Sequence, residues 1–175
     1  MLHACCAICT CSILEQMTRS GIRAAVFFFN PNIHPAEEYI RRRDEVLFYA
    51  AKHGADILPS RYDPDQWDEA VKGLETEPEG GARCRVCFDG RLEESARKAA
   101  ESGIKVFATT LGISRRKNLD EVNAAGVRAA SKYPTTEYWA INWRKGPGTR
   151  RMHEISKEEN FYRQNYCGCR HSIPS

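Results

Sequence analysis

The chain alternates short apolar runs with longer amphipathic stretches. Runs rich in strand-forming residues lie at 24–30, 55–58, 104–110 and 137–141, after a very short opening strand at 2–4. Helical spacing of apolar residues predicts helices at 12–20, 35–53, 65–74, 84–102 and 118–132. A capping-box pattern at Ser156 predicts the start of a last helix, and the Gly- and Pro-containing segment 142–151 before it is predicted to be a loop.

This alternation predicts an α/β fold, with a parallel sheet flanked by helices. Ligands of such sheets bind in the crevice beyond the carboxyl ends of the strands. The first cysteines fall directly after the opening strand, where these folds commonly hold a phosphate loop, but here thiols replace the glycines. We therefore expect one domain over 1–175, with a metal site at the carboxyl edge of the strands.

Composition narrows the class of protein. The 175 residues are 42% hydrophobic, which is enough to build a core, and the formal net charge of +3 neither requires nor excludes nucleic acid. No apolar run is long enough to cross a bilayer, so we expect no membrane partner. The first residues lack the basic and apolar regions of a secretory signal, and we expect a cytoplasmic protein.

Cysteine is the unusual residue. Seven of the eight cysteines form three groups, which are Cys5, Cys6 and Cys9, then Cys84 and Cys87, then Cys167 and Cys169. In a chain without an export signal, such clustering indicates metal or redox chemistry. Cys84 and Cys87 form a C-x-x-C pattern at a predicted helix start, where the helix dipole favours thiolates. Cys11 is the surplus thiol, and we expect it on the first helix in a packing role.

Seven thiolates exceed the ligand set of one zinc ion or one cubane cluster. They indicate either two adjacent centres or one centre and a redox pair. Adjacent side chains of an extended backbone point to opposite sides, so Cys5 and Cys6 are predicted to serve neighbouring centres, with Cys9 returning to the centre of Cys6. Iron–sulfur is favoured over zinc, because no histidine is spaced as a finger ligand.

Polar residues follow several predicted strands and are candidates for the same crevice. Substrate or RNA contacts are predicted for Asn30, Asn32, Tyr39, Arg43, Thr109, Thr110, Ser114, Lys117 and Arg163. Asp63 is a candidate metal ligand, and His34, Asp63 and Tyr166 are candidate proton donors among which the sequence does not choose. Basic clusters near aromatic residues suit RNA. For each of these residues taken singly, a structural role in a rigid turn or at a solvated surface is an equally good explanation.

Motifs along nearly the whole chain resemble the QueH-type epoxyqueuosine reductases. They are HACCAIC at 3–9, FNPNIHPAEEYIRRR at 29–43, RYDPDQW at 61–67, EPEGGARCRVCFDGRL at 77–92, TTLGISRRKN at 109–118 and YRQNYCGCRHS at 162–172. The resemblance implies an adenine-nucleotide-hydrolase-like fold of the Rossmann-like HUP type. It also implies a [4Fe-4S] cluster, an adjacent mononuclear iron and a carboxylate in the ligand set. Ile8, Cys11 and His171 depart from the usual family pattern.

The resemblance implies the last step of queuosine biosynthesis, the conversion of epoxyqueuosine to queuosine in the anticodon loop of tRNA. Removing the epoxide oxygen as water consumes two electrons and two protons, and the sequence does not identify the electron donor. Three alternatives remain open: a zinc-stabilised RNA-binding module without catalysis, an ATP-dependent tRNA thiolase, and a thiol–disulfide oxidoreductase. The first loop lacks a Ser-Gly-Gly phosphate signature, which argues against ATP.

Overall fold

The computed structural model describes residues 1–146 and 148–173. In chain order its strands are β1 (Leu2–His3), β2 (Ala25–Phe27), β3 (Asp56–Leu58), β4 (Val106–Thr109) and β5 (Glu137–Tyr138). Its helices are α1 (Ala7–Arg19), α2 (Ala36–Lys52), α3 (Pro64–Ala70), α4 (Ala82–Glu101), α5 (Leu119–Ser131) and α6 (Gly148–Glu158). Two short 3-10 turns, η1 (Leu111–Ile113) and η2 (Arg170–Ser172), complete the chain.

The five strands form one sheet in the order β3-β2-β1-β4-β5, and every neighbouring pair is parallel. Leu2 of the central strand pairs with Val26 on one side and with Ala108 on the other. This confirms the predicted α/β fold. All carboxyl ends of the strands meet at one edge, so the segments that follow β1, β2 and β4 are neighbours there.

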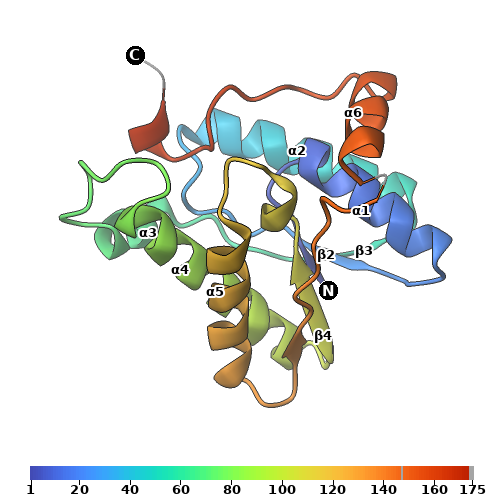
Figure 1. The fold of residues 1–175 in the computed structure, drawn as a ribbon, viewed down its shortest axis with the longest axis horizontal. Helices are drawn as coiled ribbons and strands as arrows, with labels where there is room; N and C mark the ends of the chain where they lie inside the picture. Colours follow the sequence, from blue (N-terminus) through green and yellow to red (C-terminus); the bar gives the residue numbers. More distant parts are fainter. Residues whose placement is uncertain (147, 174–175) are drawn as a thin grey trace.

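Helices cover both faces of the sheet (Figure 1). Val26 and Phe28 share a core with α1, α2 and α6, whereas Phe27 and Phe29 belong to a second core with α4 and α5. Strands buried on both faces explain the continuous apolar run at 24–29, because neither face needs polar residues. No helix of the described chain is both long and apolar enough to cross a membrane.

The last helix begins earlier than the capping-box pattern predicts. α6 spans Gly148–Glu158, so Ser156 lies buried inside the helix rather than at its start. Met152 and Ile155, three residues apart, pack into the core that α1 also lines. That burial outweighs the local signal, since most helical stability in proteins comes from tertiary packing. Residue 147 of the predicted loop lies outside the described residues.

Candidate metal centre and active site

The first three cysteines converge at the carboxyl end of β1. The ligand atoms of Cys5, Cys6 and Cys9 all lie within 4.8 Å of one another. The chain bends at Cys5, and Cys6 then caps α1 by accepting a hydrogen bond on Sγ from the Cys9 amide at 3.4 Å. The bend turns adjacent side chains toward one point, which corrects the prediction that Cys5 and Cys6 diverge toward two centres. α1 therefore begins at Ala7, five residues earlier than predicted.

The three thiols differ in the direction in which their pKa values are shifted. Hydrogen bonds from the Cys6 and Cys9 thiols hold the pKa of Cys5 well below its usual range. Hydrogen bonding to Cys5 raises the pKa of Cys6 to about 12 and raises that of Cys9 well above its usual range. One buried thiolate thus suppresses the ionisation of its neighbours. A cation at this point would replace those protons, as metal binding to thiols does.

Two side chains from distant segments, Thr110 and Gln164, donate hydrogen bonds to sulfurs of this group. The Thr110 hydroxyl accepts a hydrogen bond from the Cys5 amide at 3.1 Å and donates one to Cys5 Sγ at 3.2 Å. Gln164 Nε2 donates to Cys6 Sγ at 3.0 Å. Such outer partners orient sulfur ligands and tune the metal they bind. Gln164 has no signal in the sequence that singles it out, because its partner lies at the other end of the chain.

Four of the other five cysteines line a second cavity. Cys84 and Cys87 lie in the first two turns of α4, and Cys167 and Cys169 come from the C-terminal segment after α6. The Gly80 amide donates to Cys84 Sγ at 3.2 Å, and Cys167 Sγ lies 3.0 Å from the Ser172 hydroxyl. Hydrogen bonding from the Cys169 thiol is the largest of the effects that lower the pKa of Cys167 to about 5.

The lining of the second cavity offers the donor set of a thiolate-ligated centre. Among the described residues only the first group brings three or more ligand atoms within 4.8 Å of one another, so the four thiols are more widely spaced. Three buried N–H groups on its lining have no partner, namely Trp67 Nε1, Arg83 Nε and Arg91 Nε. Orphaned buried donors call for an acceptor, and the sulfurs of an iron–sulfur cluster accept such bonds. The donor set and the orphaned groups therefore both match a thiolate-ligated cluster.

A buried arginine of α2, Arg42, donates hydrogen bonds to the backbone at Cys167 and Tyr166. The Arg42 side chain is 3% exposed and pairs with Glu38 through an Nε–Oε1 hydrogen bond of 2.7 Å. Its two terminal nitrogens donate to the carbonyls of Cys167 at 3.1 Å and Tyr166 at 3.3 Å. Arg42 thus positions backbone that precedes and includes a thiol ligand. The predicted contact on this helix was Arg43, which instead pairs with Asp44 at the surface.

Glycine is required between Cys167 and Cys169. Gly168 has φ +109°, and a Cβ there would lie 2.8 Å from Ile33 Cγ1 and 3.2 Å from the Arg42 guanidinium. Its carbonyl accepts a hydrogen bond from the His34 amide at 2.8 Å. The C-terminal segment therefore lies directly on the loop that follows β2. This close approach is the reason for the C-G-C spacing.

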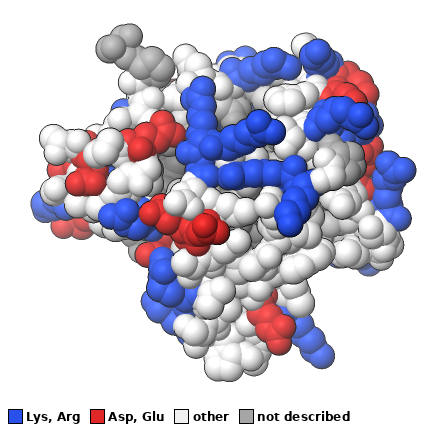
Figure 2. All heavy atoms as spheres, in the orientation of Figure 1, with Lys and Arg blue, Asp and Glu red and all other residues white. Residues whose placement is uncertain are grey.

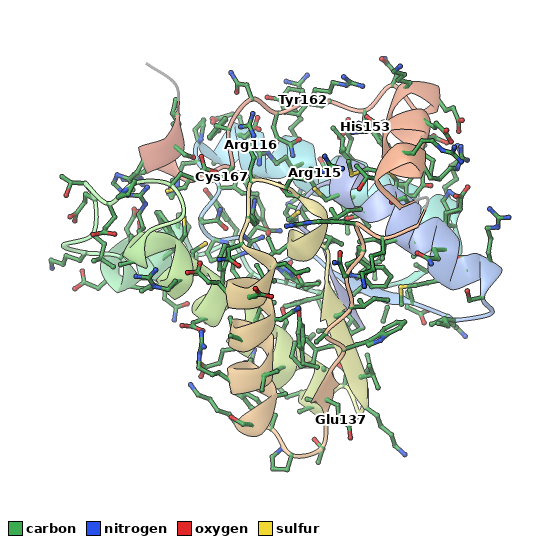
Figure 3. All side chains as sticks on the ribbon, viewed as in Figure 1. Arg115, Arg116, Glu137, His153, Tyr162 and Cys167 are labelled. Carbon is green, nitrogen blue, oxygen red and sulfur yellow. The ribbon has the colours of Figure 1, made fainter. Side chains whose placement is uncertain are left out.

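The three-thiol group opens onto a cavity of about 460 Å³. Cys5, Cys6, Cys9 and Cys167 all line it, and its walls are shared with the second cavity through Asn32, Glu79, Arg91, Arg116 and Lys117. Lys and Arg gather in a patch at the centre of the face drawn in Figure 2. In Figure 3, Arg115, Arg116, His153 and Cys167 lie at the end of the molecule opposite Glu137, which begins β5. The mouth of the site is therefore basic.

Five of the predicted site residues other than cysteine line this cavity, and they are Asn32, Ser114, Lys117, Arg163 and Tyr166. Asn32 is 2% exposed, and its Oδ1 acceptor has no partner. Asn30, Thr109 and Thr110 lie behind the cavity wall, each at most 2% exposed. Thr109 Oγ1, for example, is 2.8 Å from Nδ1 of the fully buried His3. These three residues support the site rather than line it.

Three other predicted residues have different surroundings. Tyr39 is 3% exposed and stacks on Tyr62 with ring centroids 3.9 Å apart, which favours a core role over substrate contact. Asp63 caps α3 by accepting from the Gln66 amide at 3.1 Å, so its carboxylate already has a structural task. His34 lines neither of the two thiol cavities. It is near Trp67 and lies 3.9 Å from Asp68, a carboxylate that sequence reasoning missed.

Cys11 lies on α1, as predicted for the surplus thiol. It is fully buried, and its Sγ donates to the Ile8 carbonyl at 3.2 Å. Burial raises its pKa to about 12, so it keeps its proton. It packs among core residues of α1, α2 and α6 and is absent from both thiol cavities. Its surroundings are those of a small core residue.

Comparison with known proteins shows which family this chain belongs to. A family model described as epoxyqueuosine reductase QueH matches residues 1–175. The chain is similar to epoxyqueuosine reductase QueH of Acinetobacter baylyi, at 51% identity over 99% of this chain and 79% of that protein. It is also similar to the proteins of that name from Haemophilus influenzae, at 47% identity over 99% and 71%, and Thermotoga maritima, at 35% over 99% and 89%. The chain belongs to the epoxyqueuosine reductase QueH family.

Proposed function

We propose that this chain reduces epoxyqueuosine to queuosine at the wobble position of tRNA. The reaction removes the epoxide oxygen as water and consumes two electrons and two protons. One observation carries the proposal: seven thiols, divided into a close group of three and a more widely spaced group of four, line two adjoining cavities, and the larger cavity has a basic mouth. Membership of the family supplies the substrate class.

The division of the thiols supports two different metal centres. We assign Cys5, Cys6 and Cys9 to a mononuclear iron, because three close thiols suit a single ion with an open position. Cys84, Cys87, Cys167 and Cys169 are assigned to a [4Fe-4S] cluster, which takes four thiolates. When bound, these groups supply Lewis-acid activation of an oxygen and the delivery of single electrons. The protein's part is to hold them beside one cavity.

The cavity residues suit a single extruded nucleoside. A volume of about 460 Å³ lies in the range of small-molecule pockets. An enzyme that acts on one base of an RNA must take it out of the stack. The unpaired Oδ1 of Asn32 is an acceptor for a donor on the base or its ring substituent. Arg116, Lys117 and Arg163 line the same cavity and supply positive charge for the phosphates of the anticodon loop.

Among the three candidate proton donors, position favours Tyr166. Its side chain lines the cavity, and its hydroxyl is within hydrogen-bonding distance of the His34 carbonyl. His34 lies near Asp68 and Trp67 and does not line the larger cavity, and Asp63 is engaged as a helix cap. We therefore infer that Tyr166 supplies a proton to the departing oxygen. A Tyr166→Phe variant should keep substrate binding and lose turnover.

The direct test is to incubate reduced, iron-loaded protein with tRNA that contains epoxyqueuosine. Digested nucleosides are then analysed by mass spectrometry, with unreduced protein as the control. Loss of one oxygen from the modified nucleoside, dependent on the reductant, is the expected result. An unchanged epoxide in the presence of intact clusters and a working low-potential reductant contradicts the proposal and favours an RNA-binding module.

A second experiment tests the cofactors separately from the activity. Protein purified without oxygen is analysed for iron, sulfide and zinc per chain. We expect more iron than one cubane cluster holds, with broad charge-transfer absorption. Colourless protein with stoichiometric zinc as its sole metal contradicts the assignment, whatever the tRNA assay shows.

A further inference from the structure

Arg91 is a buried charge without a carboxylate partner. It is 4% exposed, and the described residues place no Asp or Glu oxygen within ion-pair distance of it. One terminal nitrogen donates to the amide oxygen of Asn30, while Nε is buried with no partner. Burying an uncompensated charge is costly, and a single neutral amide does not offset that cost. The molecule therefore needs another source of negative charge beside this guanidinium.

The position of Arg91 indicates that source. Cys84, Cys87 and Arg91 follow the spacing of three and four residues that puts side chains on one face of a helix. Arg91 lines both the cavity of the three-thiol group and the cavity of the four-thiol group. Asn30, its partner, donates in turn to the carbonyl of Ala4, the residue before Cys5. The guanidinium thus adjoins both sets of thiols.

We propose that Arg91 is the fixed counter-charge of the two thiolate centres and sets the reduction potential of the four-thiolate cluster. This inference rests on the proposed function, because it requires that cluster. Thiolate-ligated iron–sulfur clusters carry net negative charge, which increases on reduction. A positive charge in a dry site stabilises the reduced state more than the oxidised state. Arg91 is therefore a positioning residue whose charge matters in addition to its shape.

Three variants separate charge from packing. Arg91→Met removes the charge and keeps an unbranched side chain, and Arg91→Lys keeps the charge. Arg97→Met is the matched control, because Arg97 lies on the same helix but is 40% exposed and paired with Glu94 and Glu101. Iron and sulfide per chain, the midpoint potential of the cluster and the melting temperature of metal-free protein are measured for each.

Loaded and metal-free protein should respond differently. In loaded Arg91→Met, we expect the redox equilibrium to shift at least tenfold toward the oxidised cluster, which is about 59 mV for one electron. Without metal, the same variant should melt close to the parent, because the hydrogen bond to Asn30 is the side-chain contact that it loses there. Arg91→Lys should stay close to the parent potential, and Arg97→Met should not change it. Failure of Arg91→Met to load, with loading retained in Arg91→Lys, also supports a charge requirement.

Two results overturn the inference. One is an unchanged potential in loaded Arg91→Met, and the other is a lower melting temperature of the metal-free variant, which would indicate an ordinary structural role. Failure of the proposed function looks different, because the parent protein itself would then hold no iron–sulfur cluster. In that case the metal-free melting temperatures still report on whether Arg91 has an ordinary structural role.

Discussion

Replacing Gly168 by alanine should detach the C-terminal thiols while the rest of the fold stays intact. The backbone at φ +109° is strained for any residue with a Cβ, at a cost of about 1–3 kcal/mol. The new Cβ would also lie 2.8 Å from Cγ1 of Ile33, which is 1% exposed. Overpacking of this kind adds roughly 1–3 kcal/mol.

The combined cost of roughly 2–6 kcal/mol is comparable with the contribution of the two hydrogen bonds that hold the backbone beside Gly168. The His34 amide bonds the Gly168 carbonyl, and the Arg42 guanidinium bonds the Cys167 carbonyl. A neutral hydrogen bond contributes about 1 kcal/mol and a charged one about 1.5–3 kcal/mol. The segment should therefore open locally, and the sheet and its helices should keep their stability.

A short alkylation pulse on metal-free protein, followed by mass spectrometry of each cysteine peptide, measures this opening. Cys169 is 6% exposed, and its labelling rate should rise at least tenfold, since about 1.4 kcal/mol corresponds to a factor of ten. Fully buried Cys11 is the internal control and should stay protected. Gly73→Ala is the matched variant, because it has φ +81° but open space around its Cβ. Unchanged Cys169 labelling in Gly168→Ala would refute the reasoning.

Three further predictions concern the ligands, the core and RNA binding. Cys11→Ser should retain iron, whereas Cys84→Ser should lose most of it, and equal losses by metal analysis would contradict the ligand assignment. Leu92→Ala, at a fully buried position of α4, should lower the free energy of unfolding by about 2–5 kcal/mol in a denaturant titration of metal-free protein, and a loss below about 1 kcal/mol would contradict the core assignment. Arg116→Gln should reduce the slope of log affinity for tRNA against log salt by about 0.7, while Arg150→Gln, away from the cavity, should leave the slope unchanged.

The parallel sheet and its flanking helices could be anticipated from the sequence, because buried parallel strands give continuous apolar runs and the helices between them show clear periodicity. α6 was misplaced, since its stability depends on burying Met152 and Ile155, which no local pattern reports. The cysteines could be recognised from the sequence as a candidate metal site, because they cluster in three groups. Their division into three and four could not be read from spacing, because it depends on a bend at Cys5 and on a segment that folds back from the end of the chain.

Arg42 and Arg91 could not be singled out from sequence for a related reason. Each lies near other arginines in the sequence, in a context typical of a surface residue. What distinguishes them is burial against partners far away in the chain, such as the Cys167 carbonyl for Arg42 and the Asn30 amide for Arg91. Asp68 was missed in the same way, because its neighbours His34 and Arg170 come from two other segments.

The four-thiol cavity joins the start of α4 to the C-terminal segment, and this has a consequence for biosynthesis. A chain grows from its N-terminus at about 5–20 residues per second, so Cys169 follows Cys87 by roughly 4–16 s. During that interval the C-x-x-C pair of α4 has no opposing thiols, and Arg42 has no carbonyls to bind. A cluster-delivery system that acts on the growing chain would find only Cys84 and Cys87 of the four thiol ligands. Assembly therefore has to wait until Cys167 and Cys169 have been synthesised, and the thiols made first need a reducing environment until then.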